Sequence, residues 1–151
     1  MITLQRERSS DLWPEIMPLL IEHKDEIAHY QNIELDPDQL AYDQCEMMGM
    51  LRCYTARLNG VLVGYACFFV KHNMHYSKSL QAVQDVLFVT KPHRHGRVGY
   101  RLIKFSEEQL QSEGVQVVYQ HLKCNRPETI MLFHKMGYED IDLIVAKRLD
   151  Q

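Results

Sequence analysis

The amino-acid sequence predicts an α/β or α+β domain with a single mixed, mostly antiparallel sheet and helices on both of its faces. Three observations support this class. Strand-like apolar runs and segments of helical period follow one another along the chain. Three consecutive strand-like runs in the middle are joined by short connections. Asn59-Gly60, between two of these runs, is the strongest short signal for an antiparallel hairpin.

The first third of the chain is predicted to hold one strand and two helices. Asp11 is placed to cap the first helix, and Pro18 is expected to bend or split it. Asp36-Pro37-Asp38 starts the second helix, because proline is favoured in a first helical turn. The predicted ranges are residues 2–5 for the strand and 11–28 and 36–49 for the helices.

The rest of the chain contains five predicted strands and two predicted helices. The run 61–70 is apolar on both faces, which is typical of a central strand. One face of the helix that begins at Val98 is apolar, and Gly114 ends this helix. The strands are predicted over residues 51–58, 61–71, 80–89, 115–122 and 141–149, and the helices over residues 98–113 and 126–136.

Length and composition restrict the function. The chain has 151 residues, and we expect residues 1–151 to form one domain. A formal net charge of -3 gives no general attraction to nucleic acid or to an anionic membrane. The first residues lack the apolar core of a secretion signal, and no apolar run is long enough to span a bilayer. Four scattered cysteines favour reduced thiols, so we expect a cytoplasmic protein.

The stretch between Asp85 and Glu107 is basic and contains no carboxylate. Its charged groups are Lys91, Arg94, Arg97, Arg101 and Lys104, with His93 and His95 among them. The predicted loop ends where a helix begins, so unpaired backbone N–H groups and the positive helix end point to the same place. Such a place suits a phosphate group. A solvated basic helix start without a ligand is the alternative.

The sequence VTKPHRHGRVGYRLI, residues 89–103, resembles the coenzyme A loop of the GNAT family of acyl-CoA N-acyltransferases. In that family an apolar strand end is followed by a loop with Arg or Gln, two small residues and a helix. The matching positions here are Val89, Pro92, Arg94 and Gly99. Arg97 departs from the pattern, since it stands where the family has its first glycine, and Gly96 lies one place earlier.

A second stretch, NRPETIMLFHKMGYE, resembles the other GNAT signature. The matching positions are Asn125, Leu132, Gly137 and Tyr138. The order of predicted elements also follows the family, so the resemblance covers nearly the whole chain. When His72-x-x-His75-Tyr76 is included, the sequence most resembles GNAT proteins encoded by tailed phages and prophages.

The resemblance implies the GNAT fold and transfer of an acetyl group from acetyl-CoA to a primary amine of a small molecule or a protein. It also implies that the strand before the loop separates from its neighbour at a bulge and pairs with pantetheine. The residues implied for coenzyme A are Leu87, Phe88, Val89, Arg94, His95, Gly96, Arg97, Val98, Gly99, Tyr100, Asn125 and Phe133. The expected partners are acetyl-CoA and the amine, without nucleic acid or membrane, and a homodimer is left open.

The catalytic groups are indicated less directly. Many relatives have a glutamate where Gln84 stands, and an amide cannot take a proton. Asp85 is the neighbouring carboxylate, although in a regular strand it points to the opposite face. Phe133 occupies the family's usual tyrosine position and cannot donate a proton. The candidates are Asp85 and His75 as bases and Tyr119 as the acid, with Tyr138 and His134 as further donors.

Other functions stay open at this point. Gln84 and Phe133 favour a coenzyme A-binding module without catalysis. A small interaction protein that kept the fold without coenzyme A is a second alternative. Two histidine pairs, His72/His75 and His93/His95, lack a Cys or carboxylate at a familiar ligand spacing, so we predict no metal site.

The acceptor has no specific signature in the sequence. Candidates for lining its cleft are Tyr30, Tyr42, Met47, Met48 and Met50, although methionines at helical spacing are more often part of a core.

Overall fold

The computed structural model describes all 151 residues, Met1–Gln151, and they form two compact units, residues 1–121 and 122–151. The first unit contains β1 (Ile2–Glu7), α1 (Ser9–Ile27), α2 (Gln39–Met47), β2 (Leu51–Leu58), β3 (Val61–His72), β4 (Leu80–Val89), a single 3-10 turn (Lys91–His93), α3 (Val98–Ser112) and β5 (Val117–Tyr119). The second unit contains α4 (Pro127–Lys135). One domain over residues 1–151 stays a prediction.

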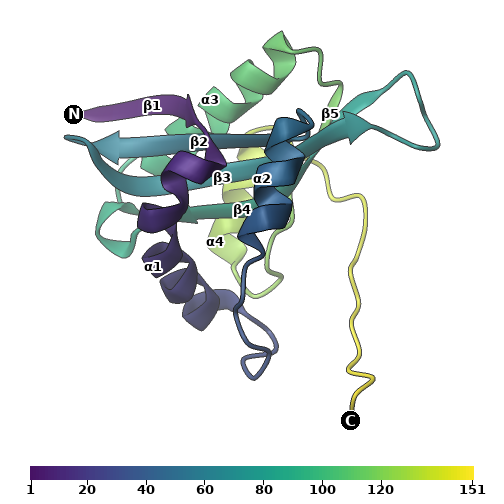
Figure 1. Ribbon diagram of the computed structural model, residues 1–151, viewed down its shortest axis with the longest axis horizontal. Coiled ribbons are helices and arrows are strands. Elements are labelled where there is room, and N and C mark those ends of the chain that lie inside the picture. Colours follow the sequence, from purple (N-terminus) through teal and green to yellow (C-terminus); the bar gives the residue numbers. More distant parts are fainter. The chain divides into compact units, whose positions relative to one another are not determined.

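The first unit is a sheet between two layers of helices. Its five strands lie in the order β1-β2-β3-β4-β5. The pairs β1–β2, β2–β3 and β3–β4 are antiparallel, and the pair β4–β5 is parallel. The α1 and α2 helices cover one face of the sheet and α3 covers the other (Figure 1). The predicted fold class, a mixed and mostly antiparallel sheet with helices on both faces, is confirmed.

The β3 strand is central because its side chains contribute to both apolar layers. Val63 and Phe68 pack in the cluster on the α3 side, together with Leu102 of α3. Tyr65 and Cys67 pack in the cluster on the α1 side, together with Ile16 of α1. The prediction of a strand that is apolar on both faces is therefore confirmed.

The Asn59-Gly60 hairpin is also confirmed. Both residues have positive φ angles, 50° for Asn59 and 85° for Gly60. A two-residue loop of this kind matches the twist of its flanking strands. The β2 strand ends at Leu58 and β3 begins at Val61, as predicted.

A β-bulge interrupts β4 at Asp85. Cys67 of β3 is opposite Val86, whereas the next residue, Phe68, is opposite Gln84, so Asp85 has no partner. A bulge of this type shifts the alternation of side chains by one position. Asp85 and Val86 consequently line the same cavity, on the α1–α2 side of the sheet. In a regular strand Asp85 would point to the opposite face of the sheet, and the bulge is the reason that it does not.

The β4 and β5 strands are paired over only three positions, from Gln81 and Val117 to Val83 and Tyr119. The predicted strand over residues 115–122 is therefore too long. From Gln84 onward, no strand pairs with the outer edge of β4. The backbone N–H and C=O groups of this edge have no strand partner. Such groups require hydrogen-bond partners, which a ligand can supply.

Two local predictions are wrong. The α1 helix begins at Ser9, earlier than predicted, and continues past Pro18 as one helix. It is held by burial of Leu12 and Ile16, and the Ser9 N–H donates to the Glu46 carboxylate at 2.6 Å. Residues 141–149 form no strand, and their large apolar side chains are exposed. Alternation makes a segment fit for a strand, but a strand also needs a neighbouring edge.

Gly64 allows β3 to approach the end of β4 closely. A Cβ atom at this position would lie 3.1 Å from the Phe88 carbonyl oxygen and 3.3 Å from Cγ2 of Val89. We expect Gly64→Ala to lower the free energy of unfolding by about 1–3 kcal/mol, because β4 must shift to relieve the contact. Urea denaturation measures the change. Gly96→Ala is the control, since a Cβ there meets no atom within 4 Å. Equal midpoints for both variants would contradict the prediction.

Candidate active site

The basic loop after β4 leads directly into α3. The first helical hydrogen bond runs from the Arg101 N–H to the Arg97 carbonyl at 2.9 Å. The backbone N–H groups of residues 95–100 donate to no backbone acceptor, and no side chain caps the helix. The first turn of α3 contains no acidic residue. This helix end therefore has free donors and a positive potential, as an anion site requires.

Arg94 is less available than its place in the motif suggests. Its guanidinium makes a two-pronged ion pair with Glu26 of α1, at 2.7 and 2.9 Å. Its Nε donates to the Val89 carbonyl at 2.7 Å, and the guanidinium lies 5.2 Å from the centre of the Phe88 ring. The Arg94 side chain is half-buried by these contacts, and its predicted contact with coenzyme A stays a prediction. In this structure Arg94 fixes the loop against α1 and the end of β4.

Arg97 has the exposure that Arg94 lacks. It immediately precedes α3, and its guanidinium lies 5.0 Å from the centre of the Tyr100 ring. Gly96 beside it faces open space, so the fold itself does not require a glycine there. His95 is exposed, whereas Val98 is buried against the sheet and Gly99 and Tyr100 are half-buried. Backbone groups and the Arg97 side chain are therefore the parts of the loop open to a ligand.

The free edge of β4 connects this loop with the bulge. Leu87 and Val89 point to the α3 side, and Phe88 is buried on the α1 side against Tyr65. These side chains pack in the core, so only the backbone N–H and C=O groups of this edge are available to a ligand. The bulge at Asp85, the free edge of β4 and the loop amides follow one another in this order along the sequence.

Asp85 lies in a cavity of about 30 Å³ between α1, α2 and the sheet. The Tyr42 hydroxyl of α2 donates to Asp85 Oδ2 at 2.6 Å, and Oδ1 accepts no hydrogen bond from the protein. Burial raises the pKa of Asp85 above its usual range, and the Tyr42 hydroxyl lowers it in part. The apolar walls are Leu12, Trp13, Ile16, Leu20 and Val86, with Cys53 and Cys67.

Gln84 bridges the opening between the two diverging strands. Its side-chain oxygen accepts a hydrogen bond from the His121 N–H at 2.7 Å. His121 follows β5, so the amide ties the two sides of the opening together. The residue that replaces the family's usual glutamate thus has a structural partner, and Asp85 is the carboxylate at the bulge.

The other predicted catalytic residues lie at different places. Tyr119 is half-buried and forms the last β4–β5 pair with Val83, so it borders the opening. His75 is exposed in the connection before β4, and its N–H donates to the Asn73 side chain at 2.8 Å. Asp85 lies five residues after Leu80, the first residue of β4, which is about 16 Å at roughly 3.3 Å per residue, and His75 lies before that strand begins. The structure does not bring His75 together with Asp85 and Tyr119.

Asn125 and Phe133 belong to the second unit. Asn125 is exposed just before α4, and Phe133 is the buried residue of that helix. The Phe133 ring packs on Tyr138 with a centroid distance of 5.0 Å. His134 bonds to Asp140 at 2.7 Å. The roles predicted for Asn125 and Phe133 stay predictions.

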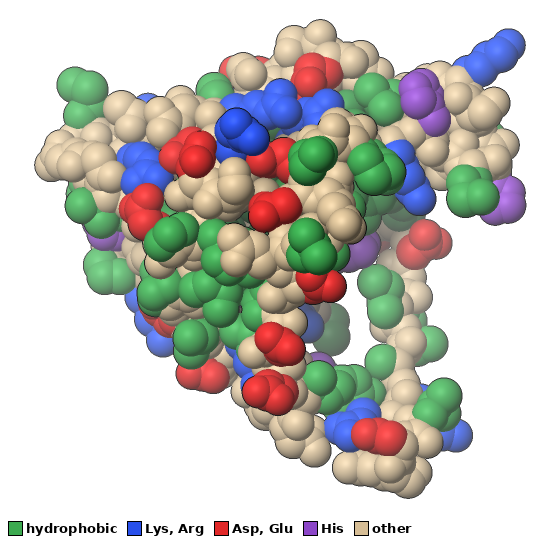
Figure 2. Space-filling model, viewed as in Figure 1, with side chains coloured by type: hydrophobic (Ala, Val, Ile, Leu, Met, Phe, Trp, Pro, Cys, Tyr) green, Lys and Arg blue, Asp and Glu red, His purple; other side chains and the backbone are tan.

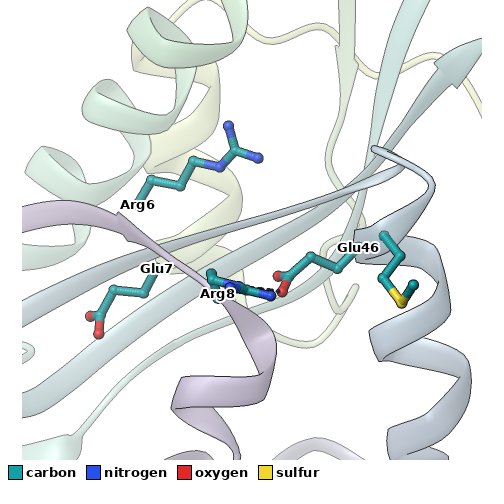
Figure 3. Close-up of a pocket in the computed structure, with 5 residues that line it drawn as sticks. Arg6, Glu7, Arg8 and Glu46 are labelled. Atoms are coloured by element: carbon teal, nitrogen blue, oxygen red, sulfur yellow. Dashed lines mark ion pairs between the residues drawn. The ribbon is translucent and has the colours of Figure 1, made fainter.

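A second, larger pocket of about 370 Å³ lies where β1, α1 and α2 meet (Figure 3). It is lined by Arg6, Glu7, Arg8, Glu46 and Met47. Glu46 already pairs with Arg8 at 3.7 Å and accepts the Ser9 N–H, and Arg6 pairs with Glu113 at 3.7 Å. These charges balance one another, so the pocket has no unpaired group that requires a ligand.

The sequence was compared with known families and proteins. The model of the Acetyltransferase (GNAT) family matches residues 13–138. The chain belongs to the GNAT family. No curated protein matches the sequence. Members of the GNAT family use acetyl-CoA and amine acceptors. The expected likeness to phage-encoded GNAT proteins stays a prediction.

Solved structures with this fold align with nearly the whole length of this protein. An aminoglycoside acetyltransferase, HMB0005, from an uncultured soil metagenomic sample has a TM-score of 0.79 at 15% identity, over 99% of each chain. Ribosomal-protein-alanine N-acetyltransferase from Brucella melitensis biovar Abortus 2308 has a TM-score of 0.73 at 15% identity, over 98% of this chain and 99% of that chain.

A third similar structure, AAC(6')-Iy, was solved in complex with the bisubstrate analog CoA-S-monomethyl-acetylneamine. Its TM-score is 0.71 at 16% identity, over 98% of this chain and 97% of that chain. At these identities the likeness establishes the GNAT fold and not the acceptor. No helix of the present structure is long and apolar enough to cross a membrane.

Proposed function

We propose that this GNAT protein is an N-acetyltransferase that moves the acetyl group of acetyl-CoA to a primary amine. The observation that carries the proposal is the uncapped start of α3, which follows the free edge of β4 along the chain. One element offers donors and positive charge to phosphates, and the other offers backbone groups to an extended chain. Acetyl-CoA has both parts in that order.

The residues present fit acetyl-CoA at this place. The amides of residues 95–100 lack protein acceptors, no carboxylate lies nearby in the loop, and Gly96 faces open space. We assign these amides and the Arg97 side chain to the pyrophosphate, and the backbone of residues 87–89 to pantetheine. Arg94 supports this site by holding the loop to Glu26 and is assigned no direct contact.

Asp85 is the proposed general base. When bound, acetyl-CoA supplies a thioester whose C–S bond breaks as the amine nitrogen bonds to the acetyl carbon. Of the three protons of the ammonium form, one stays on the amide, one leaves with the thiol and one passes through Asp85 to solvent. A carboxylate whose pKa is raised by burial is a better proton acceptor at neutral pH than an ordinary one. Tyr119, at the opening between β4 and β5, is the proposed proton donor to the thiolate.

Thermal unfolding in the presence of acetyl-CoA tests the proposal. A ligand that binds only the folded state raises its stability by mass action, by about 2.7 kcal/mol at 100 times Kd. We expect saturating acetyl-CoA, and free coenzyme A, to raise the melting temperature by several degrees. AMP serves as the control, since it lacks pantetheine and one phosphate of the pyrophosphate. An unchanged melting temperature with acetyl-CoA would contradict the proposal.

A coenzyme A-binding module without catalysis is the second candidate. It is favoured by Gln84, which is hydrogen-bonded to the backbone at His121, and by Phe133, which has no exchangeable proton. Both candidates predict binding of acetyl-CoA. Only the enzyme releases free thiol when amines are added, and a thiol-reactive dye detects that release.

A further inference from the structure

The cavity at Asp85 holds a carboxylate that has no cationic partner in the protein. Asp85 forms one hydrogen bond, with Tyr42, and takes part in no ion pair. Its other neighbours in the cavity are mostly aliphatic and aromatic. A charged group in such surroundings is costly unless a partner satisfies it. A cation or a strong hydrogen-bond donor from outside the chain would satisfy it.

The charge of the covering helices also favours a cation. The α1 helix has five carboxylates and one lysine, and α2 has two carboxylates and no basic residue. Three of the seven carboxylates pair with arginines, and the four without an arginine partner are Asp11, Glu22, Asp25 and Asp43. Figure 2 shows hydrophobic side chains gathered between α1 and α2, with acidic side chains around them. A negative rim around an apolar entrance raises the local concentration of cations. The basic loop before α3, by contrast, attracts anions.

The cavity is unsuited to a ligand with many hydroxyl groups. Ser9 already donates its N–H to Glu46 and its hydroxyl to Asp43, and Tyr42 donates its hydroxyl to Asp85. Cys53 and Cys67 contribute thiols, which are weak hydrogen-bonding groups. Oδ1 of Asp85 is therefore the strongest free acceptor of the lining. Sugar hydroxyls would be buried there without adequate partners.

The size of the cavity sets a second limit. The cavity leaves about 30 Å³ for the centres of water-sized groups, which suffices for an ammonium or methyl group. A sugar ring carrying its amine directly cannot bring that amine to Asp85 without displacing the walls. An amine at the end of a slender chain can reach Asp85 without displacing the walls.

We infer that the acceptor is a primary amine at the end of an unbranched methylene chain, and that Asp85 pairs with its ammonium group. The chain lies against the rings of Trp13 and Tyr42, whose centroids are 5.8 Å apart. Such rings also favour a cation at their faces. A free alkylamine and a lysine side chain both have this chemistry. The inference rests on the proposed acetyl transfer and specifies its acceptor.

Initial rates with four amines test the inference. The methylene-chain amines are hexylamine and an amino-terminally blocked peptide with one internal lysine, and these two distinguish the free source from the protein source. The sugar amines are glucosamine, whose amine is attached to the ring, and kanamycin, whose amines are attached to a ring or lie one methylene away from it. We expect kcat/KM for at least one methylene-chain amine to exceed that of both sugars by about 100-fold or more, the discrimination that an apolar pocket gives against an added hydroxyl.

Added salt and a binding measurement complete the test. The KM for the preferred amine should rise with salt concentration, because the acidic rim is screened. Acetyl-CoA binding is measured first by calorimetry. Failure to bind would overturn the proposed function together with this inference. Binding with equal or faster acetylation of glucosamine or kanamycin would overturn the inference alone. Binding with transfer to none of the four amines would overturn the inference and would favour the coenzyme A-binding module over the enzyme.

Discussion

Asp85→Asn should lower kcat/KM for amine acetylation by about 10²–10⁴-fold, the usual contribution of a positioned base. The substitution keeps the size of the side chain, and its amide oxygen can still accept the Tyr42 hydroxyl. An amide cannot take the proton from the ammonium group, so the loss should fall on catalysis. The affinity for acetyl-CoA, measured by calorimetry, should stay unchanged. A variant with nearly full activity would show that Asp85 is not the base.

The stability of the same variant gives an independent readout. Because burial raises the pKa of Asp85 in the folded protein, its ionised form opposes folding. This cost is absent below the usual pKa of an aspartate and appears as the pH rises through the raised value. Asp85→Asn should therefore melt no lower than the parent at neutral pH, and the difference should vanish at acidic pH. Asp25→Asn, at an exposed position of α1, is the matched control.

The pH dependence of the parent follows from the groups around Asp85. The titratable groups that face it are Tyr42 of α2, Cys53 of β2 and Cys67 of β3, and α1 contributes none. Burial and Asp85 keep the pKa of the Tyr42 hydroxyl well above its usual range, so it stays a donor. Activity should rise with pH as Asp85 loses its proton. Tyr42→Phe should move this rise to higher pH, since the hydroxyl lowers the pKa of Asp85.

Arg97→Glu should weaken acetyl-CoA binding by about 10- to 100-fold, the range lost with a charged hydrogen bond of about 1.5–3 kcal/mol. The new carboxylate would repel the pyrophosphate, and it would also compete for the free amides at the start of α3. The fold should tolerate the change, because Arg97 is exposed and forms no ion pair with the protein.

The matched control for this variant is Lys78→Glu. Lys78 is also exposed, and it lies in the connection before β4, at the opposite end of that strand. The two variants change the net charge equally, so a general electrostatic effect would weaken both. Calorimetry should show weaker binding for Arg97→Glu alone. Equal affinities for the two variants would exclude the loop as the phosphate site.

Features that depend on neighbouring residues in the sequence could be predicted from it. The Asn59-Gly60 loop needs only two residues with positive φ, and the flanking strands follow from it. The limits of β2 and β4 were likewise given by runs of apolar residues between polar connections. The basic loop was visible because it combines a strand end, a helix start and the absence of carboxylates.

Features that depend on distant contacts could not be predicted. Arg94 is bound to Glu26, 68 positions away, and no local pattern indicates that pair. The direction of Asp85 depends on a register shift against β3, which the alternation of β4 does not encode. The segment 141–149 alternates like a strand but forms no strand in this structure. The sequence makes Tyr42 a candidate for lining a cleft, but its hydrogen bond to Asp85 is visible only in the folded structure.

A titration with coenzyme A, followed through the backbone amide resonances of ¹⁵N-labelled protein, tests the central claim most directly. The claim is that coenzyme A lies along the free edge of β4 and against the start of α3. We predict the largest shifts at residues 95–100 and 87–89, with little change at Arg6 to Arg8 beside the larger pocket. Shifts confined to that pocket, or no shifts at saturating coenzyme A, would contradict the claim.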